Sequence, residues 1–196
     1  MRRQLGTALR ATVALIVLLG LVYPLVVTGL GQAFFGRQAD GSLVKVGSTV
    51  VGSALIGQEF TDARGNPLPQ YFQPRPSAAG KGYDPTDSGA TNLGPSNPVL
   101  LSAVAQRVEA YRRFNHLAPG TPVPVDAVTS SGSGLDPDIS EANALDQAPR
   151  VAAARHLAIP TVVALVHGHT DGRAWGVLGE ATVNVLDLNV ALDRMA

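Results

Sequence analysis

A long run of apolar residues lies near the start of the chain. No charged residue occurs between Ala11 and Gly36, and Val, Leu, Ile and Ala dominate the stretch. As a helix this run would rise about 37 Å, enough to cross a hydrocarbon core about 30 Å thick. We therefore predict a transmembrane helix over residues 11–36, preceded by a short segment, residues 1–10.

A cleaved secretory signal peptide is the competing interpretation of this run, because it would also begin with arginines. Its apolar region would be only about 7 to 15 residues long, so we favour a retained anchor. Pro24 is expected to kink or interrupt the helix. Together with Gly20, Gly29 and Gly31, Pro24 indicates packing against other membrane helices, although an ordinary lone anchor can have the same residues.

Beyond the apolar run, the pattern is typical of a single mixed α/β domain over residues 37–196. Short β segments are expected at 43–46 and 50–56, broken by glycines. A long stretch rich in proline and glycine follows, residues 61–98. Its aromatic residues argue against simple disorder, so we expect it to be functional or flexible loop structure.

Helices are predicted in the second half of the chain. Asn97 and Pro98 are expected to start an amphipathic helix that is docked on a core and ends near Asn115. Ser140 or Asp138 would cap the next helix.

Prolines and turn residues set the remaining boundaries. We expect Pro149 to begin a separate helix and Pro160 another. Residues 128–140 are too small and polar to predict a core element, and residues 182–195 read as a short strand passing into a terminal helix.

The distribution of arginines predicts how the apolar helix is oriented. Arg2, Arg3 and Arg10 precede the run, whereas Arg37 and Lys45 follow it. Since basic residues concentrate on the cytoplasmic side of membrane proteins, the N-terminus should be cytoplasmic. The chain is thus predicted to be a single-pass protein of the cell (inner) membrane with an extracytoplasmic domain.

Overall composition excludes several classes of function. Fifteen basic and fifteen acidic residues give a net charge of zero, and the chain has no cysteine. Nucleic-acid binding requires clustered Lys and Arg side chains that neutralise phosphates. Beyond the first ten residues the sequence shows no such stripe of basic residues. Without cysteine there can be no thiolate metal site and no cysteine nucleophile.

The sequence contains no complete catalytic motif of the kinds considered below. Gly82 follows Lys81 where a phosphate-binding loop needs Ser or Thr, and Ser133 is one residue out of register with a nucleophile elbow. His167 and His169 would share a metal only in an extended segment. We therefore predict no catalytic residue, no metal site and no cofactor for this chain.

Two glycine-rich polar loops remain, residues 88–98 and 129–137. The backbone amides of such loops can hold anions, but the same composition also makes ordinary tight turns.

Several motifs spread over nearly the whole chain carry a family resemblance. They are Tyr23-Pro24, Gly52-Ser53-x-x-Ile56-Gly57, Tyr71-Phe72, Arg75-Pro76-Ser77, Asn92-Leu93-Gly94-Pro95, the stretch from Val128 to Ser140, and Leu178-Gly179-Glu180. With these motifs the chain resembles the KdpC family, the C subunits of bacterial Kdp potassium-transporting P-type ATPases. It departs from that family by carrying Asp138 where members often have histidine.

The resemblance implies a non-catalytic accessory subunit of a high-affinity, ATP-driven potassium uptake complex. The implied partners are a channel-like potassium-binding subunit, the P-type ATPase catalytic subunit and membrane lipid. The Asp-Lys-Thr-Gly phosphorylation motif is absent from the sequence, so ATP and potassium would be handled by the complex. The subunit would support assembly and modulate pump activity or ATP affinity; alternatively, it would be a nucleotide-binding chaperone that acts directly on the ATPase subunit.

The candidate site consists of residues in exposed polar loops that could contact a partner or a nucleotide: Arg75, Ser131, Gly132, Ser133, Gly134 and Asp136. Two other classes of protein stay open. One is a membrane-anchored extracytoplasmic hydrolase that uses Ser133 or the histidine pair. The other is an anchored binding module without partner subunits.

Overall fold

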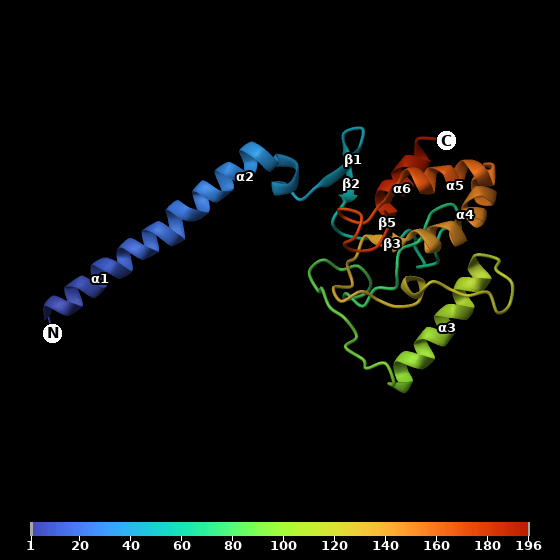
Figure 1. The fold of residues 1–196 in the computed structure, drawn as a ribbon, viewed down its shortest axis with the longest axis horizontal. Coiled ribbons are helices and arrows are strands. Elements are labelled where there is room, and N and C mark those ends of the chain that lie inside the picture. The colour runs from blue at the N-terminus through green and yellow to red at the C-terminus, as the bar shows by residue number, and fades with distance from the viewer. Residues whose placement is uncertain (1, 196) are drawn as a thin grey trace. The chain divides into compact units, whose positions relative to one another are not determined.

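A computed structural model describes residues 2–195 of the chain. The described chain divides into two compact units, one ending at Leu43 and the other beginning at Val44 (Figure 1). Residue 1 of the predicted segment 1–10 and residue 196 of the predicted domain lie outside the described range.

The first unit is a long helix. It comprises α1 (Arg2–Val17), the π-helical stretch η1 (Leu18–Val22) and α2 (Tyr23–Ala39). From Arg3 to Ala39 it is long and apolar enough to cross a membrane, and no part of its most apolar window is buried. The predicted N-terminal apolar helix is therefore confirmed.

Pro24 changes the form of this helix without interrupting it. Proline lacks the N–H that would bond to the carbonyl of Gly20, and its ring crowds that carbonyl. The helix widens just before Pro24. There Tyr23 N–H donates to Leu18 O, which is five residues back instead of four. This π-helical turn accommodates the proline.

The chain after the long helix forms two small sheets. β1 (Leu43–Val46) and β2 (Thr49–Ser53) form the first; β1 has the predicted bounds, whereas β2 begins one residue before the predicted segment 50–56 and ends at Ser53. The second has the order β3-β5-β4 and is antiparallel. Its strands are β3 (Asp138–Ser140), β4 (Thr170–Asp171) and β5 (Thr182–Asn184).

The prediction that residues 128–140 hold no core element is wrong. Ile139 of β3 pairs with Val183 of β5, and both side chains are buried. One apolar residue at the correct register is enough to bring this polar segment into the sheet.

The helix predicted at Asn97 and Pro98 is confirmed as α3 (Pro98–Phe114). Asn97 Oδ1 accepts from Val99 N, and Asn115 ends the helix. No residue in α3 is fully buried; its half-buried residues recur at helical spacing along one face. The helix is thus amphipathic and packs on the surface of the domain.

Three further helices pack around the core (Figure 1): α4 (Glu141–Arg155), α5 (Ile159–Gly168) and α6 (Val185–Asp193), with the short 3-10 turn η2 (Val125–Ala127) before them. Ser140 caps α4 through its hydroxyl, and Asn184 caps α6. Pro160 lies at the start of α5, as predicted.

The expectation that Pro149 starts a separate helix is wrong, because α4 continues through it. A proline inside a helix removes one backbone hydrogen bond. Here the helix is held from both sides of the proline, since Ala148 and Val151 are fully buried in the core and Gln147 and Arg150 are tied to other segments. Tertiary contacts thus override the local signal.

The main core lies between these helices and the three-stranded sheet. Its buried residues come from α4, α5, α6 and the sheet, and one comes from the long irregular stretch: Phe72, Ile139, Ala144, Ala148, Val151, Ala152, Val162, Val166, Val183, Val185, Leu188 and Leu192. A smaller cluster joins Val44 to Leu186 and Val190. The chain is therefore a mixed α/β protein with one long apolar helix followed by a small α/β domain.

Candidate functional site

Residues 69–73 of the irregular stretch are held in place by helix side chains. The Phe72 ring is fully buried. The side-chain amide of Asn189, in α6, makes two hydrogen bonds with the backbone of Phe72. It accepts from Phe72 N and donates to Phe72 O, each at 2.9 Å. Gln147 of α4 pairs with the backbone of Gln73 in the same way. Its Oε1 accepts from Gln73 N at 2.8 Å, and its Nε2 donates to Gln73 O at 3.0 Å. Two side-chain amides thus take the role that a neighbouring strand would have.

Arg150 completes this arrangement from the interior. Only 3% of the residue is exposed, and its guanidinium donates to oxygens of Pro69, Tyr71, Asn115 and Gln147. Burial lowers the pKa of Arg150 to about 10, so the group remains charged at neutral pH. A buried charge of this kind is tolerated because carbonyl and amide oxygens surround it.

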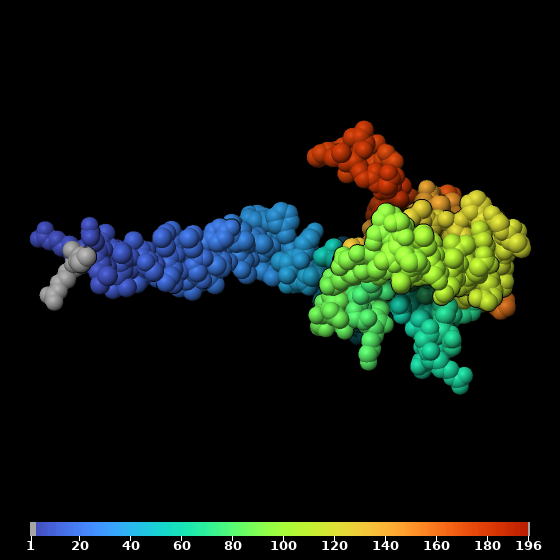
Figure 2. Space-filling view, turned by 90° about the horizontal axis from the view of Figure 1, so that it is seen from below, coloured from blue at the N-terminus to red at the C-terminus, as the bar shows by residue number. Residues whose placement is uncertain are grey.

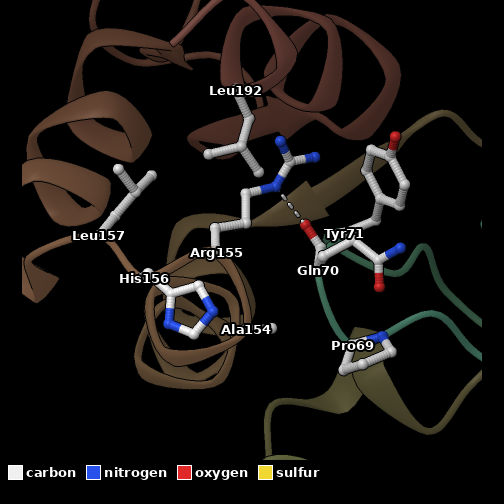
Figure 3. Close-up of a pocket in the computed structure, with 8 residues that line it drawn as sticks. All are labelled: Pro69, Gln70, Tyr71, Ala154, Arg155, His156, Leu157 and Leu192. Carbon is white, nitrogen blue, oxygen red and sulfur yellow. Dashed lines mark hydrogen bonds between the residues drawn. The ribbon is translucent and has the colours of Figure 1, made fainter. Parts of the chain in front are cut away.

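The outer side of the same segment borders a hollow of about 590 Å³ (Figure 3). There Arg155 Nε donates to Gln70 O at 2.7 Å, and Arg155 Nη2 lies 2.6 Å from Asp193 Oδ1. The same guanidinium lies over the Tyr71 ring. The segment is therefore attached to α4 and α6 along its whole length, and its conformation is determined by tertiary contacts.

The candidate loop 129–137 is joined to residues 75–83 through Ser77. The Ser77 hydroxyl donates to Gly134 O at 2.6 Å and accepts from Ala79 N and Tyr83 N. Tyr83 OH donates to Arg75 O at 2.9 Å. Burial, with smaller contributions from nearby carboxylates, raises the pKa of Tyr83, so this phenol keeps its donor proton.

The two glycine-rich loops predicted from the sequence lie side by side. Ser88 Oγ and Gly89 N both donate to Ser133 O at 2.9 Å. On the other side, Gly57 N donates to Leu135 O at the same distance. We call the assembly of residues 75–89 with residues 129–138 the loop bracket.

Gly134 lies where the loop bracket is tightest. It is buried and has φ +68°. A Cβ there would be 2.6 Å from Ala79 N and 2.7 Å from Gly89 O. The position therefore requires glycine for both its conformation and its space.

All six candidate residues belong to this bracket. Arg75 Nη1 lies 2.8 Å from Asp136 Oδ2. Ser131 Oγ accepts from Gly134 N and Ser133 Oγ accepts from Leu135 N, at 2.9 and 3.1 Å. A Cβ on Gly132 would meet no atom within 4 Å. Contact of these residues with a partner or a nucleotide stays a prediction.

A groove of about 320 Å³ runs beside Arg75, between α3 and the irregular stretch. Arg107 of α3 also lines it and donates from Nη1 to Val128 O at 3.1 Å. Asp138 lies at the opposite end of the loop, where it accepts from Asn184 Nδ2 at 3.2 Å. Burial, and next the charge of Asp136, raises the pKa of Asp138.

The residues considered for catalysis have separate partners. Ser133 Oγ contacts Ser131 Oγ and Leu135 N, whereas His167 Nδ1 lies 2.8 Å from Glu141. His169 Nδ1 lies near Leu165 O. Within residues 2–195, no group of three histidine or carboxylate side chains is placed to hold a metal ion.

The sequence reasoning missed the polar residues that hold the irregular stretch. Asn143, Gln147 and Arg150 follow one another at spacings of four and three, which places them on one face of α4. All are buried, beside Ala144 and Val151. Polar residues that lie at helical spacing next to the apolar face of a helix are the signal that could have revealed them.

Comparisons with known proteins find relatives over nearly the full chain. The family model described as "KdpC: K+-transporting ATPase, c chain" matches residues 5–194. A protein of Mycobacterium tuberculosis named potassium-transporting ATPase KdpC subunit is 57% identical over 195 residues, covering 100% of both chains. Proteins with the same name from Rhodospirillum rubrum and Koribacter versatilis are 52% and 48% identical, and cover 99% and 98% of this chain and 97% and 95% of their own.

Proposed function

Because the chain belongs to the KdpC family of K+-transporting ATPase c chains, we propose that it supports assembly of the Kdp complex and modulates its activity from the extracytoplasmic side. It is a subunit of that complex with an accessory role in potassium transport and is not itself the catalytic enzyme. The match over residues 5–194 carries the proposal, since it includes both the apolar helix and the α/β domain.

The proposed partners are a channel-like potassium-binding subunit and the P-type ATPase catalytic subunit. The arginines before the apolar helix support a cytoplasmic N-terminus. A domain on the far side cannot touch cytoplasmic ATP, so any effect on ATP affinity would pass through the membrane subunits. Direct nucleotide binding by the loop bracket is the alternative, and it requires the domain to be cytoplasmic.

The side on which the domain lies can be tested with single cysteines, because the chain has none of its own. Glu109→Cys lies at an exposed position of α3, and Gln4→Cys lies near the start of α1. In right-side-out membrane vesicles, we expect a membrane-impermeant maleimide to label Glu109→Cys and to leave Gln4→Cys unlabelled until the vesicles are opened.

The cysteine-free chain is the control for background labelling. Inside-out vesicles should reverse the pattern. If Glu109→Cys is protected in right-side-out vesicles and Gln4→Cys is labelled, the domain is cytoplasmic and direct contact with nucleotide becomes the better proposal.

Assembly is tested by co-purification in mild detergent. We expect the tagged chain to bring down both proposed partners. A variant in which residues 11–36 are replaced by an unrelated apolar helix of equal length should keep most of this recovery, because the proposed contacts lie in the domain. A chain that purifies alone would instead be an anchored module without partner subunits, and loss of recovery only in the swapped variant would assign assembly to the helix.

A further inference from the structure

The hairpin between β4 and β5 has an apolar tip that is exposed in the described domain, residues 44–195. Ala174 and Leu178 pair across it, and Trp175, Gly176 and Val177 form the turn. Trp175 is 90% exposed and Val177 is 71% exposed. In Figure 2 the hairpin, in orange-red, projects away from the body of the domain.

The conformation of Trp175 is unfavourable for the isolated chain. Its φ of +53° lies in the left-handed region, which costs a bulky residue roughly 1–2 kcal/mol. Its exposed ring gains almost nothing from burial. Neither the turn, where Asn or Asp would fit better, nor the core explains a tryptophan here, so an external contact is the remaining explanation.

The chemistry of the tip fits a lipid surface. Residues 174–179 carry no charge, and the flanking charges neutralise each other, because Arg173 Nη2 lies 2.7 Å from Glu180 Oε2. Tryptophan is the residue most typical of the boundary between lipid and water, where an apolar ring and a polar N–H are both accommodated.

The tip is too small for a specific protein interface of ordinary size. A buried tryptophan contributes about 150–250 Å², and Val177 and Leu178 add less than that. Each side of a stable protein interface buries about 800 Å². A lipid surface needs no such matching area, since each inserted apolar group contributes separately.

The chain connects the apolar helix to the domain through a short segment. Residues 40–42 are all that separate the end of α2 at Ala39 from the start of β1 at Leu43, and such a segment spans at most about 14 Å. The neighbouring Val44 packs against Leu186, two residues beyond the end of β5. The base of the hairpin thus lies at the part of the domain where the chain enters from the apolar helix.

From these observations we propose that the tip at Trp175 inserts into the interfacial region of the lipid bilayer. The inference rests on the membrane anchoring that belongs to the proposed function. It would give the domain a second attachment to the membrane and so restrict its rotation about the short connection.

Trp175 is the single tryptophan of the chain, so its fluorescence tests the proposal directly. The full chain is reconstituted into phosphatidylcholine vesicles, and flotation of the vesicles first verifies anchoring. We expect vesicles made with lipids brominated near the headgroup to quench most of the emission, and aqueous acrylamide to quench it little. The emission should also be shifted to the blue relative to tryptophan in water.

The matched control is the double variant Trp175→Phe with Val125→Trp, which moves the tryptophan to another exposed site of the domain, in η2. Its emission should be quenched by acrylamide and not by the brominated lipids. Equal lipid quenching of both proteins would overturn the assignment to the hairpin tip.

Other outcomes separate this inference from the proposed function. If the chain floats with vesicles while Trp175 stays open to acrylamide, the inference fails and the anchoring stands. Protection of Trp175 that arises only when the other Kdp subunits are added would assign the tip to a protein partner and overturn the lipid assignment. A chain that does not float would overturn both.

Discussion

Replacing Arg150 with methionine is expected to lower the free energy of unfolding of the domain by about 3–5 kcal/mol. Methionine keeps much of the apolar stem that packs near Phe114, whose ring lies 4.2 Å from the guanidinium. It leaves the oxygens of Pro69, Tyr71 and Asn115 without their buried donor. Since small domains are stable by only about 5–15 kcal/mol, much of the native population would be lost on mild heating.

The measurement is urea denaturation of the full chain in mild detergent, with unfolding monitored by circular dichroism. Arg113→Met is the matched control, because Arg113 is exposed on α3 and its loss should change stability by less than about 0.5 kcal/mol. Equal midpoints for the two variants would show that the buried guanidinium does not stabilise the segment 69–73.

Local signals predicted the elements of this fold where the chain determines its own structure. The apolar run was enough to predict that residues 11–36 form a helix, since few other structures accommodate so many consecutive apolar residues. Asn97 and Pro98 marked the start of α3 because the cap and the proline act within one turn of the helix. Residues 182–195 became a strand and then a helix as their pattern indicated.

Tertiary contacts decided the parts that the sequence did not reveal. Pro149 stays inside α4 because residues on both sides of it are fixed by the core and by the segment 69–73. That segment has no strand pattern of its own, and its conformation comes from Gln147 and Asn189, distant in sequence. Such pairings of side chain with backbone have no local signature.

The sequence identified the two candidate loops but did not predict that they are in contact. The sequence marked the two glycine-rich loops, and the structure brings them together through Ser88, Gly89 and Ser133. It could not show that Ser77 joins them, because a serine within an Arg-Pro-Ser turn gives no indication of its distant acceptor, Gly134 O. The composition of a loop reveals its flexibility and its donors, whereas its partners depend on the fold.

Replacing Gly134 with alanine is expected to destabilise the domain by about 3 kcal/mol, because the left-handed conformation and the missing space both oppose a side chain. The added Cβ would press on backbone atoms of Ala79 and Gly89, which cannot rotate away. Urea denaturation of the full chain measures the loss. Gly132→Ala is the matched control in the same loop, where the Cβ would meet open space and stability should change by less than about 0.5 kcal/mol.

The same pair of variants distinguishes a scaffolding role of the loop from direct contact with nucleotide. If the glycines serve the fold of the loop bracket, Gly134→Ala should reduce co-purification and pump activity together, and Gly132→Ala should change neither. If the loop contacts ATP, the open position at Gly132 is where a ligand could approach the backbone closely, so Gly132→Ala would weaken the apparent ATP affinity of the complex at unchanged stability. That second result would contradict the extracytoplasmic role, because ATP reaches the pump from the cytoplasm.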